Sequence, residues 1–182
     1  LYDVDRTAAK VAEALRAAGV DEVHEGIGRT GVVGVIRGQS NVSGRVIGLR
    51  SDMDALPIIE ETGKPWASRV PGKMHACGHD GHTAMLLGAA RHLADSRAFD
   101  GTVIVIFQPA EEGGAGARAM IEDGLFTRWP CNEVYAMHNR PDLPVGQFTI
   151  NSGPIMGSVD EVKITITGRG GHAARPDQTI DP

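Results

Sequence analysis

The sequence predicts an α/β fold, in which amphipathic helices alternate with strands that lead into polar loops. One observation is a continuous run of β-branched and apolar residues over residues 102–107, which is typical of a strand buried on both faces. A second is the helical spacing of apolar side chains in residues 6–18 and 82–94. A third is the presence of carboxylates and histidines directly after strand-like runs, where α/β sheets commonly place their chemistry.

The composition excludes several classes of partner. A net charge of −5 and a hydrophobic content of 41% indicate a soluble globular chain with no electrostatic footprint for nucleic acid. No apolar run approaches the roughly 18 residues of a membrane-spanning helix, and no secretory signal is visible, although the chain opens without Met. We therefore expect a cytoplasmic protein with no nucleic-acid or membrane partner, in which Cys77 and Cys131 are reduced.

The first third of the chain supplies scaffold. Residues 6–18 form the first expected helix, which Gly19 ends. Short β-rich runs at residues 32–36 and 45–49 flank a turn-forming segment, so we predict neighbouring strands, with antiparallel pairing as one arrangement. Residues 26–31 match the dinucleotide fingerprint GxGxxG but lie between a helix and a strand-like run, so we expect no nucleotide site there.

Three expected strands end in polar side chains. Asp52 and Asp54 follow the second short run, Glu111 and Glu112 follow the long apolar run, and His138 ends a later strand. The alternative for the aspartates is a solvated acidic loop, and for the glutamates a helix N-terminus whose dipole they stabilise. Because neighbouring side chains at a strand end point different ways, one glutamate could bind metal while the other acts as a general base.

Residues 74–82 contain three histidines, a cysteine and a carboxylate, a density that predicts a metal site. Cys77 and His79 lie two residues apart, so an extended or looping backbone directs both side chains toward one ion. A chance cluster in a polar loop is the alternative. The chain offers more acids and imidazoles than one closed four-ligand site uses, which favours an open site or two ions about 3.5 to 4 Å apart.

Toward its carboxyl end the sequence changes character. After a helix expected over residues 113–123, residues 147–151 indicate a brief strand, and residues 161–167 alternate apolar and polar side chains. Alternation predicts a sheet with one face in water, unlike the long apolar run. We therefore expect one domain over residues 1–155 and the beginning of a second over residues 156–182.

Five segments, taken in order, resemble the M20 metallopeptidase family: residues 49–57, 74–82, 107–113, 137–138 and 168–176. Within this family they are similar to the branch of aminoacylases, hippurate hydrolases and indole-acetyl-amino-acid hydrolases. The resemblance covers nearly the whole chain. It implies a dinuclear amidohydrolase with a mixed-sheet α/β catalytic domain and an inserted α+β lid domain that often dimerises, so we expect a homodimer.

The resemblance also implies roles for single residues. The metal ligands carry over onto Cys77, His79, Glu112 and His138, with two divalent ions of zinc, manganese, cobalt or nickel expected. Glu111 matches the general base that shuttles the proton.

Three further residues have counterparts in the family. Asp54 matches an acid that in many relatives follows a ligand histidine by two residues, but Asp52 occupies that first position here. The resemblance therefore implies that Cys77 replaces the lost ligand and that both aspartates orient ligands. His172 matches a lid histidine that in relatives reaches the partner protomer's active site and helps to stabilise the oxyanion.

The function implied is hydrolysis of the amide bond of an N-acyl amino acid or related small conjugate by metal-activated water, with Glu111 as base. Carboxypeptidase or dipeptidase action is the alternative within the same chemistry. A metal-stabilised binding module without turnover is the alternative from another class of function. Relatives supply a last histidine ligand near their carboxyl terminus, which has no counterpart before Pro182. We therefore expect a fragment of a longer protein that is inactive alone.

Overall fold

The computed structural model describes residues 1–160 and 162–181. Contacts between Cα atoms divide the chain into two compact units, Leu1–Arg140 and Pro141–Pro182, which are described separately. The expected domains over residues 1–155 and 156–182 stay a prediction. Among the described residues, none of the helices has the length and apolar character that crossing a bilayer requires.

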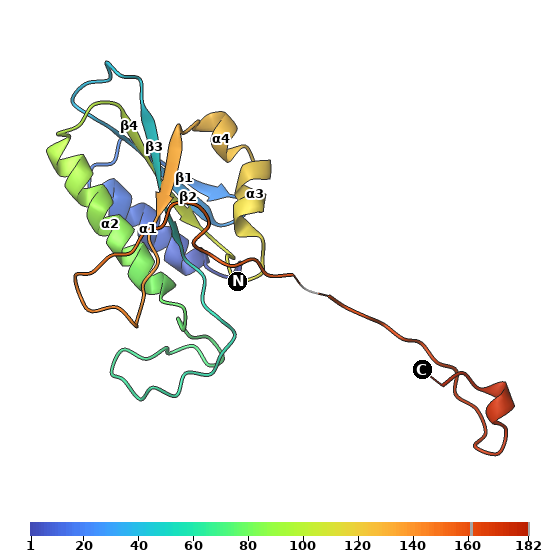
Figure 1. Cartoon of the computed structure of the whole chain (residues 1–182). Coiled ribbons are helices and arrows are strands. Elements are labelled where there is room, and N and C mark those ends of the chain that lie inside the picture. The colour runs from blue at the N-terminus through green and yellow to red at the C-terminus, as the bar shows by residue number, and fades with distance from the viewer. Residues whose placement is uncertain (161, 182) are drawn as a thin grey trace. The chain divides into compact units, whose positions relative to one another are not determined.

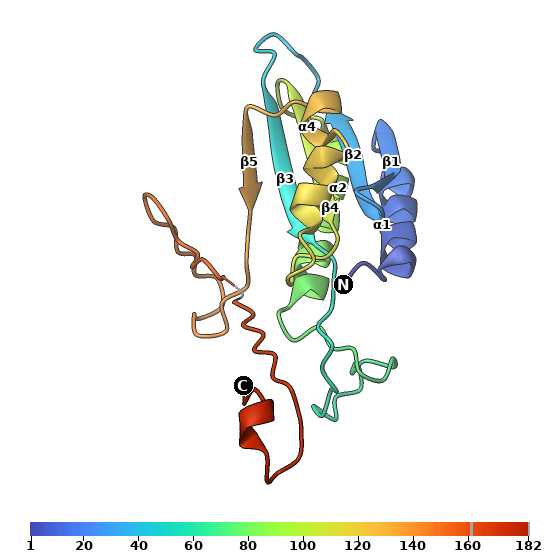
Figure 2. The same cartoon turned by 90° about the vertical axis from the view of Figure 1, so that its right-hand side faces the viewer.

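The first unit is built on a five-stranded sheet with the strand order β1-β2-β4-β3-β5 (Figures 1 and 2). Its strands are β1 (Glu22–Ile27), β2 (Gly31–Arg37), β3 (Val46–Asp52), β4 (Thr102–Gln108) and β5 (Glu133–Ala136). β2 pairs antiparallel with β1 and with β4, whereas β3 pairs parallel with β4 and with β5. The sheet is therefore mixed, as expected.

β4 lies at the centre of the sheet because both of its faces are apolar. Val103, Val105 and Phe107 pack into the core on one side of the sheet. Ile104 and Ile106 pack into a second core on the other side. The prediction that residues 102–107 form a strand buried on both faces is confirmed.

The two short runs predicted to be neighbours do form strands, β2 and β3, but they are not adjacent. β4 lies between them, antiparallel to β2 and parallel to β3, so β2 and β3 run in opposite directions without pairing. The adjacency was wrong because the buried backbone N–H and C=O groups of β4 need hydrogen-bonded partners along both edges, and β2 and β3 are those partners.

Helices cover both faces of the sheet (Figure 1). α1 (Asp5–Ala17) and α2 (His79–Ser96) pack on one face through Val11, Leu15, Leu86 and Ala90. α3 (Gly116–Glu122) and α4 (Leu125–Arg128) pack on the other through Met120 and Leu125. The predicted helices are confirmed, although α2 begins three residues earlier than the apolar spacing indicated and α3 begins three residues later.

The fingerprint-like segment at residues 26–31 forms the turn of a hairpin between β1 and β2. Gly28 has φ +57°, and a Cβ atom there would lie 2.5 Å from the Met120 backbone nitrogen. The glycine therefore permits close packing of the hairpin on α3. A strand, β2, follows the segment, whereas the dinucleotide fingerprint opens a helix at this position.

The second unit contains a single 3₁₀ turn, η1 (Pro176–Gln178), and an isolated bridge between Arg169 and Ile180 among its described residues. The strands predicted over residues 147–151 and 161–167 do not form in the described part of these segments, and residue 161 lies outside it. Alternation alone does not make a strand, because a strand needs a hydrogen-bonded partner, and residues 162–167 pair with none of the described residues.

Candidate metal centre

The parallel strands β3, β4 and β5 end at one edge of the sheet, which we call the carboxyl edge. The loops that follow these strands carry most of the predicted site residues, and α2 begins beside them. The structure brings together seven of these residues: Asp52, Asp54, Cys77, His79, Glu111, Glu112 and His138.

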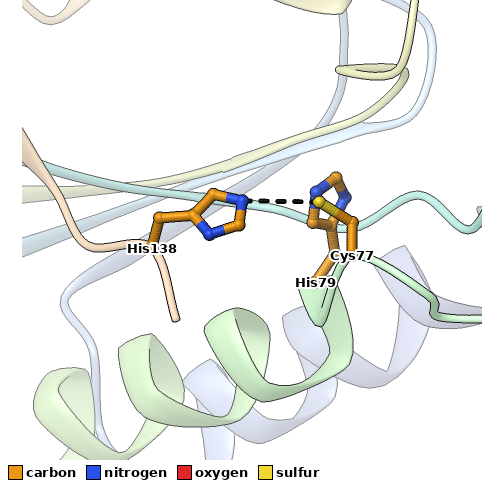
Figure 3. A group of neighbouring side chains, drawn as sticks. All are labelled: Cys77, His79 and His138. Atoms are coloured by element: carbon orange, nitrogen blue, oxygen red, sulfur yellow. Dashed lines mark hydrogen bonds between the residues drawn. The ribbon is translucent and has the colours of Figure 1, made fainter. Parts of the chain in front are cut away.

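Cys77, His79 and His138 present their ligand atoms within 4.8 Å of one another (Figure 3). The Cys77 Sγ atom lies 3.4 Å from His138 Nε2. Gly78, between Cys77 and His79, directly precedes α2 and has φ +84°, a left-handed conformation that favours glycine. This turn directs both flanking side chains to the same place, as the sequence spacing predicts.

His79 is buried, and one of its ring nitrogens has no hydrogen-bond partner. Its Nδ1 atom lies 3.2 Å from Asp54 Oδ1. Its Nε2 atom is unpartnered, with carboxylate oxygens of Asp52 at 3.6 Å, Glu112 at 3.8 Å and Glu111 at 4.0 Å. Buried polar atoms are rarely left in this state. A cation among these atoms would satisfy both the imidazole and the carboxylates, and the Asp54 contact is the partner that a metal-binding histidine usually has.

The loop after β4 presents Glu111 and Glu112 differently. Ala110, which precedes them, is buried and has φ +49°, an uncommon conformation for a residue with a side chain. The Ala110 carbonyl accepts a hydrogen bond from Gly116 N, and the Glu112 backbone N–H donates to Asp54 at 3.1 Å. These bonds fix Glu112 toward the cluster, with its side chain 23% exposed, whereas that of Glu111 is 43% exposed.

Asp52 and Asp54 are both fully buried and ionised. Burial by itself would raise the pKa of Asp52, but the hydrogen bond with His82 and the charge of Arg50 outweigh it and lower the pKa. Burial opposes the same change at Asp54, where hydrogen bonds from His79 and the Glu112 backbone lower the pKa. Both carboxylates therefore remain negative charges beside the imidazoles.

The same negative charge acts on Cys77. Burial and the neighbouring carboxylates of Glu112 and Glu111 raise the pKa of the thiol to about 11. Burial would lower the pKa of His79, but Asp54 and Asp52 outweigh it and raise the pKa. A divalent cation reverses this balance, because it stabilises a thiolate and offsets the carboxylates. The residues present therefore fit a divalent metal.

Among the residues that the structure describes, three overlapping sets of side chains could hold metal, and His79 belongs to all of them. The sets are Cys77 with His79 and His138, Asp52 with His79 and His82, and His79 with Glu111 and Glu112. A centre with two ions that share this region agrees with the surplus of ligands in the sequence.

Two residues of the cluster, His82 and Asn139, received no role from the sequence. His82 is buried, with its ring centroid 4.5 Å from that of His138. One signal could have found His82: it lies three residues after His79, on the same face of α2. No comparable signal identifies Asn139, because its partner His82 lies 57 residues away in the sequence.

His172 lies in the second unit and is exposed. Its Nδ1 atom accepts a hydrogen bond from the Ala174 backbone N–H at 3.1 Å. Its predicted role at the oxyanion stays a prediction.

Comparisons with known proteins agree with this geometry. The family model described as peptidase family M20/M25/M40 matches residues 48–180. The N-acetylcysteine deacetylase of Bacillus subtilis is 51% identical over 155 residues, which cover 85% of this chain and 40% of that protein. The hippurate hydrolase of Campylobacter jejuni is 49% identical over 181 residues, which cover 100% of this chain and 46% of that protein. This chain therefore spans less than half the length of these relatives.

A solved structure is also similar. The Bacillus subtilis YXEP protein, described as a dinuclear metal binding peptidase from the M20 family, matches with a TM-score of 0.74 and 45% sequence identity. The match covers 80% of this chain and 40% of that one.

Proposed function

This chain belongs to peptidase family M20/M25/M40, and from that premise we propose that the whole protein hydrolyses the amide bond of N-acyl amino acids or related small conjugates. Support comes from relatives named hippurate hydrolase and N-acetylcysteine deacetylase. The observation that carries the proposal is the buried, unpartnered His79 Nε2 atom facing three carboxylates, which is a site prepared for a cation.

We propose Cys77, His79, Glu112 and His138 as the residues that hold two divalent ions, with Asp52 and Asp54 orienting them. Zinc, manganese, cobalt and nickel are the candidate metals, and the thiolate and imidazole ligands favour the softer of them. Such ions lower the pKa of water toward neutrality and polarise the substrate carbonyl.

Glu111 is the proposed general base. It lies at the border of the cluster, 4.0 Å from His79 Nε2, and its side chain is the more exposed of the two glutamates. From this position its carboxylate can accept a proton from water and deliver it to the leaving amine. Glu112 is less exposed, and Asp54 accepts a hydrogen bond from its backbone N–H, so it is suited to bind metal.

Matched glutamine variants of the whole protein test these roles. Glu111→Gln should keep its metal but lose roughly 10² to 10⁴ in the rate of hippurate or N-acetyl amino acid hydrolysis, the contribution typical of acid–base catalysis. Glu112→Gln should lose both activity and metal. The metal content is measured as metal ions per protein molecule after gel filtration. Equal metal loss in both variants would refute the assignment.

Carboxypeptidase or dipeptidase action is the second candidate, and one observation favours it. The thermostable carboxypeptidase 1 of Saccharolobus solfataricus is 46% identical over 185 residues, covering 100% of this chain and 46% of that protein. A panel of N-acyl amino acids, dipeptides and blocked peptides separates the two substrate classes. Metal binding without turnover of any member would instead indicate a binding module.

We also propose that residues 156–182 begin a lid domain through which a cytoplasmic homodimer forms, with His172 stabilising the oxyanion across the dimer. In such a dimer each complete site takes Glu111 from one protomer and His172 from its partner. Mixing Glu111→Gln with His172→Ala should then restore part of the activity once subunits exchange. A mixture that exchanges subunits and stays inactive would refute the arrangement across the dimer. Cell fractionation tests the proposed cytoplasmic location.

A further inference from the structure

We propose that His82 and Asn139 are positioning residues that hold His138 against Cys77 and His79, and thereby set the affinity of the centre for a divalent cation. The inference rests on the metal ligands of the proposed function. It assigns roles to two side chains that lie beside the cluster.

His82 connects the end of β3 to the residue that follows His138. Its Nδ1 atom lies 2.7 Å from Asp52 Oδ1. Its Nε2 atom lies 3.1 Å from the Asn139 backbone nitrogen and 2.6 Å from Asn139 Oδ1. The ring is 2% exposed, so these contacts are made away from water, where hydrogen bonds are strongest.

His138 depends on such a connection because its own segment is weakly held. β5 is a four-residue edge strand with every residue exposed, and it ends at Ala136, two residues before His138. A ligand at the end of a short exposed strand varies in position unless a neighbouring residue is fixed. The contact between His82 and Asn139 fixes the adjacent residue.

Asn139 also touches the segment that carries the other two ligands. A Cβ atom on Gly78 would lie 2.6 Å from Asn139 Oδ1 and 2.9 Å from its Cγ. The Asn139 side chain therefore packs directly on the residue between Cys77 and His79. Through this one side chain, the segment that carries His138 is kept in register with the turn that carries Cys77 and His79.

His82 could instead be a metal ligand, since it forms a possible set with Asp52 and His79. The hydrogen bonds argue against this role. Both ring nitrogens of His82 have partners, Asp52 at one and Asn139 at the other, whereas the Nε2 atom of His79 has none. A nitrogen that is engaged by Asn139 is not available to a cation, so His82 acts through Asn139.

Two substitutions of His82 separate its two contacts. In His82→Asn the short amide reaches the place of Nδ1, so the Asp52 contact is kept and the Asn139 contact is lost. In His82→Gln the longer amide reaches the place of Nε2, so the Asn139 contact is kept. Asn139→Ala removes the Asn139 side chain from His82 Nε2 and from Gly78, while the backbone N–H at position 139 still reaches Nε2. His92→Asn is a control because His92 is exposed on the same helix.

The experiment is a titration of the metal-free whole protein with Co²⁺. Binding is monitored through the thiolate-to-cobalt charge-transfer absorption band. We expect His82→Asn and Asn139→Ala to weaken Co²⁺ binding about 10- to 100-fold and to reduce the band, as loss of a residue that orients a ligand usually does. His82→Gln should recover most of the affinity, and His92→Asn should equal the wild type. Circular dichroism and the melting temperature of each metal-free variant verify folding.

The outcomes distinguish this inference from the proposed function. A wild-type protein that binds Co²⁺ without a thiolate band would contradict the metal centre itself. If the wild-type protein shows the band, and folded His82→Asn and Asn139→Ala bind Co²⁺ with wild-type affinity, the positioning role alone is overturned. Equal losses in His82→Asn and His82→Gln would overturn it too, because the connection to Asn139 would then not matter. If His82→Asn fails to fold, Asn139→Ala decides.

Discussion

The two ends of the same parallel strands use aspartate in opposite ways. Before β4, at the amino edge, Asp100 accepts hydrogen bonds from the Ser40 hydroxyl and from the backbone N–H groups of Val42 at 2.8 Å and Ser43 at 2.9 Å. At the carboxyl edge, Asp52 lies among imidazoles and other carboxylates, and the Nε2 atom of His79 has no partner.

The difference lies in the balance of donors and acceptors. At the amino edge the chain supplies enough donors, and the hydrogen bonds with Ser40 and Ser43 hold the pKa of Asp100 well below its usual range. That carboxylate closes a loop and needs no ligand. At the carboxyl edge Asp52 and Asp54 also accept hydrogen bonds, but the buried Nε2 atom of His79 has no partner and lies within 4.0 Å of the carboxylates of Asp52, Glu111 and Glu112, an arrangement that a cation would satisfy. An unpartnered buried imidazole nitrogen among carboxylates therefore separates the metal centre from the structural carboxylate of Asp100.

The largest expected effect comes from removing one residue at each edge. His79→Ala should abolish metal retention and reduce hydrolysis by the whole protein to background, because His79 belongs to each ligand set found in the described part of the chain. Asp100→Ala should retain metal and activity but lower the melting temperature, because the loop loses its hydrogen-bond acceptor. Metal content and thermal melts of both variants check this. Loss of metal in Asp100→Ala would erase the contrast between the two edges.

A smaller effect is the pH dependence of metal binding. Because the pKa of Cys77 is about 11 in the metal-free protein, binding must release the thiol proton, so affinity should rise with pH. The rise is up to about tenfold per pH unit for each proton released. Zinc titrations between about pH 6.5 and 8.5 measure it.

Matched serine variants identify the proton. Cys77→Ser should flatten the pH dependence, since its hydroxyl does not ionise in this range. Cys131→Ser should keep it, because Cys131 packs against the other core and belongs to none of the ligand sets found among the described residues. A slope unchanged in Cys77→Ser would exclude the thiol as the source.

The smallest expected effect concerns acid stability in the metal-free protein. The pKa of Asp54 is lowered on folding, so its ionised form stabilises the folded state above the unfolded pKa of about 3.9. That stabilisation is lost as the pH falls through the folded pKa. Asp54→Asn should therefore show a weaker decline of unfolding free energy below about pH 5 than the parent protein. Urea denaturation at several pH values tests this, and an unchanged decline would contradict the assignment.

Local patterns in the sequence predicted much of the fold and of the site. The apolar run of β4 and the spacing of Cys77 and His79 are properties of short segments, and the structure places both as expected. Strand adjacency was missed because β4 enters the sheet between β2 and β3, although its first residue, Thr102, lies 50 residues after the end of β3 at Asp52. The contact between His82 and Asn139 was missed for the same reason, since it joins side chains that no local pattern relates.

X-ray absorption by the zinc-loaded whole protein tests the central claim, a metal centre at the carboxyl edge that includes Cys77, most directly. Zinc bound there should show a sulfur neighbour at about 2.3 Å together with nitrogen and oxygen neighbours at about 2.0 to 2.2 Å. The sulfur signal should disappear in Cys77→Ser and persist in Cys131→Ser. A zinc shell without sulfur in the parent protein would contradict the account.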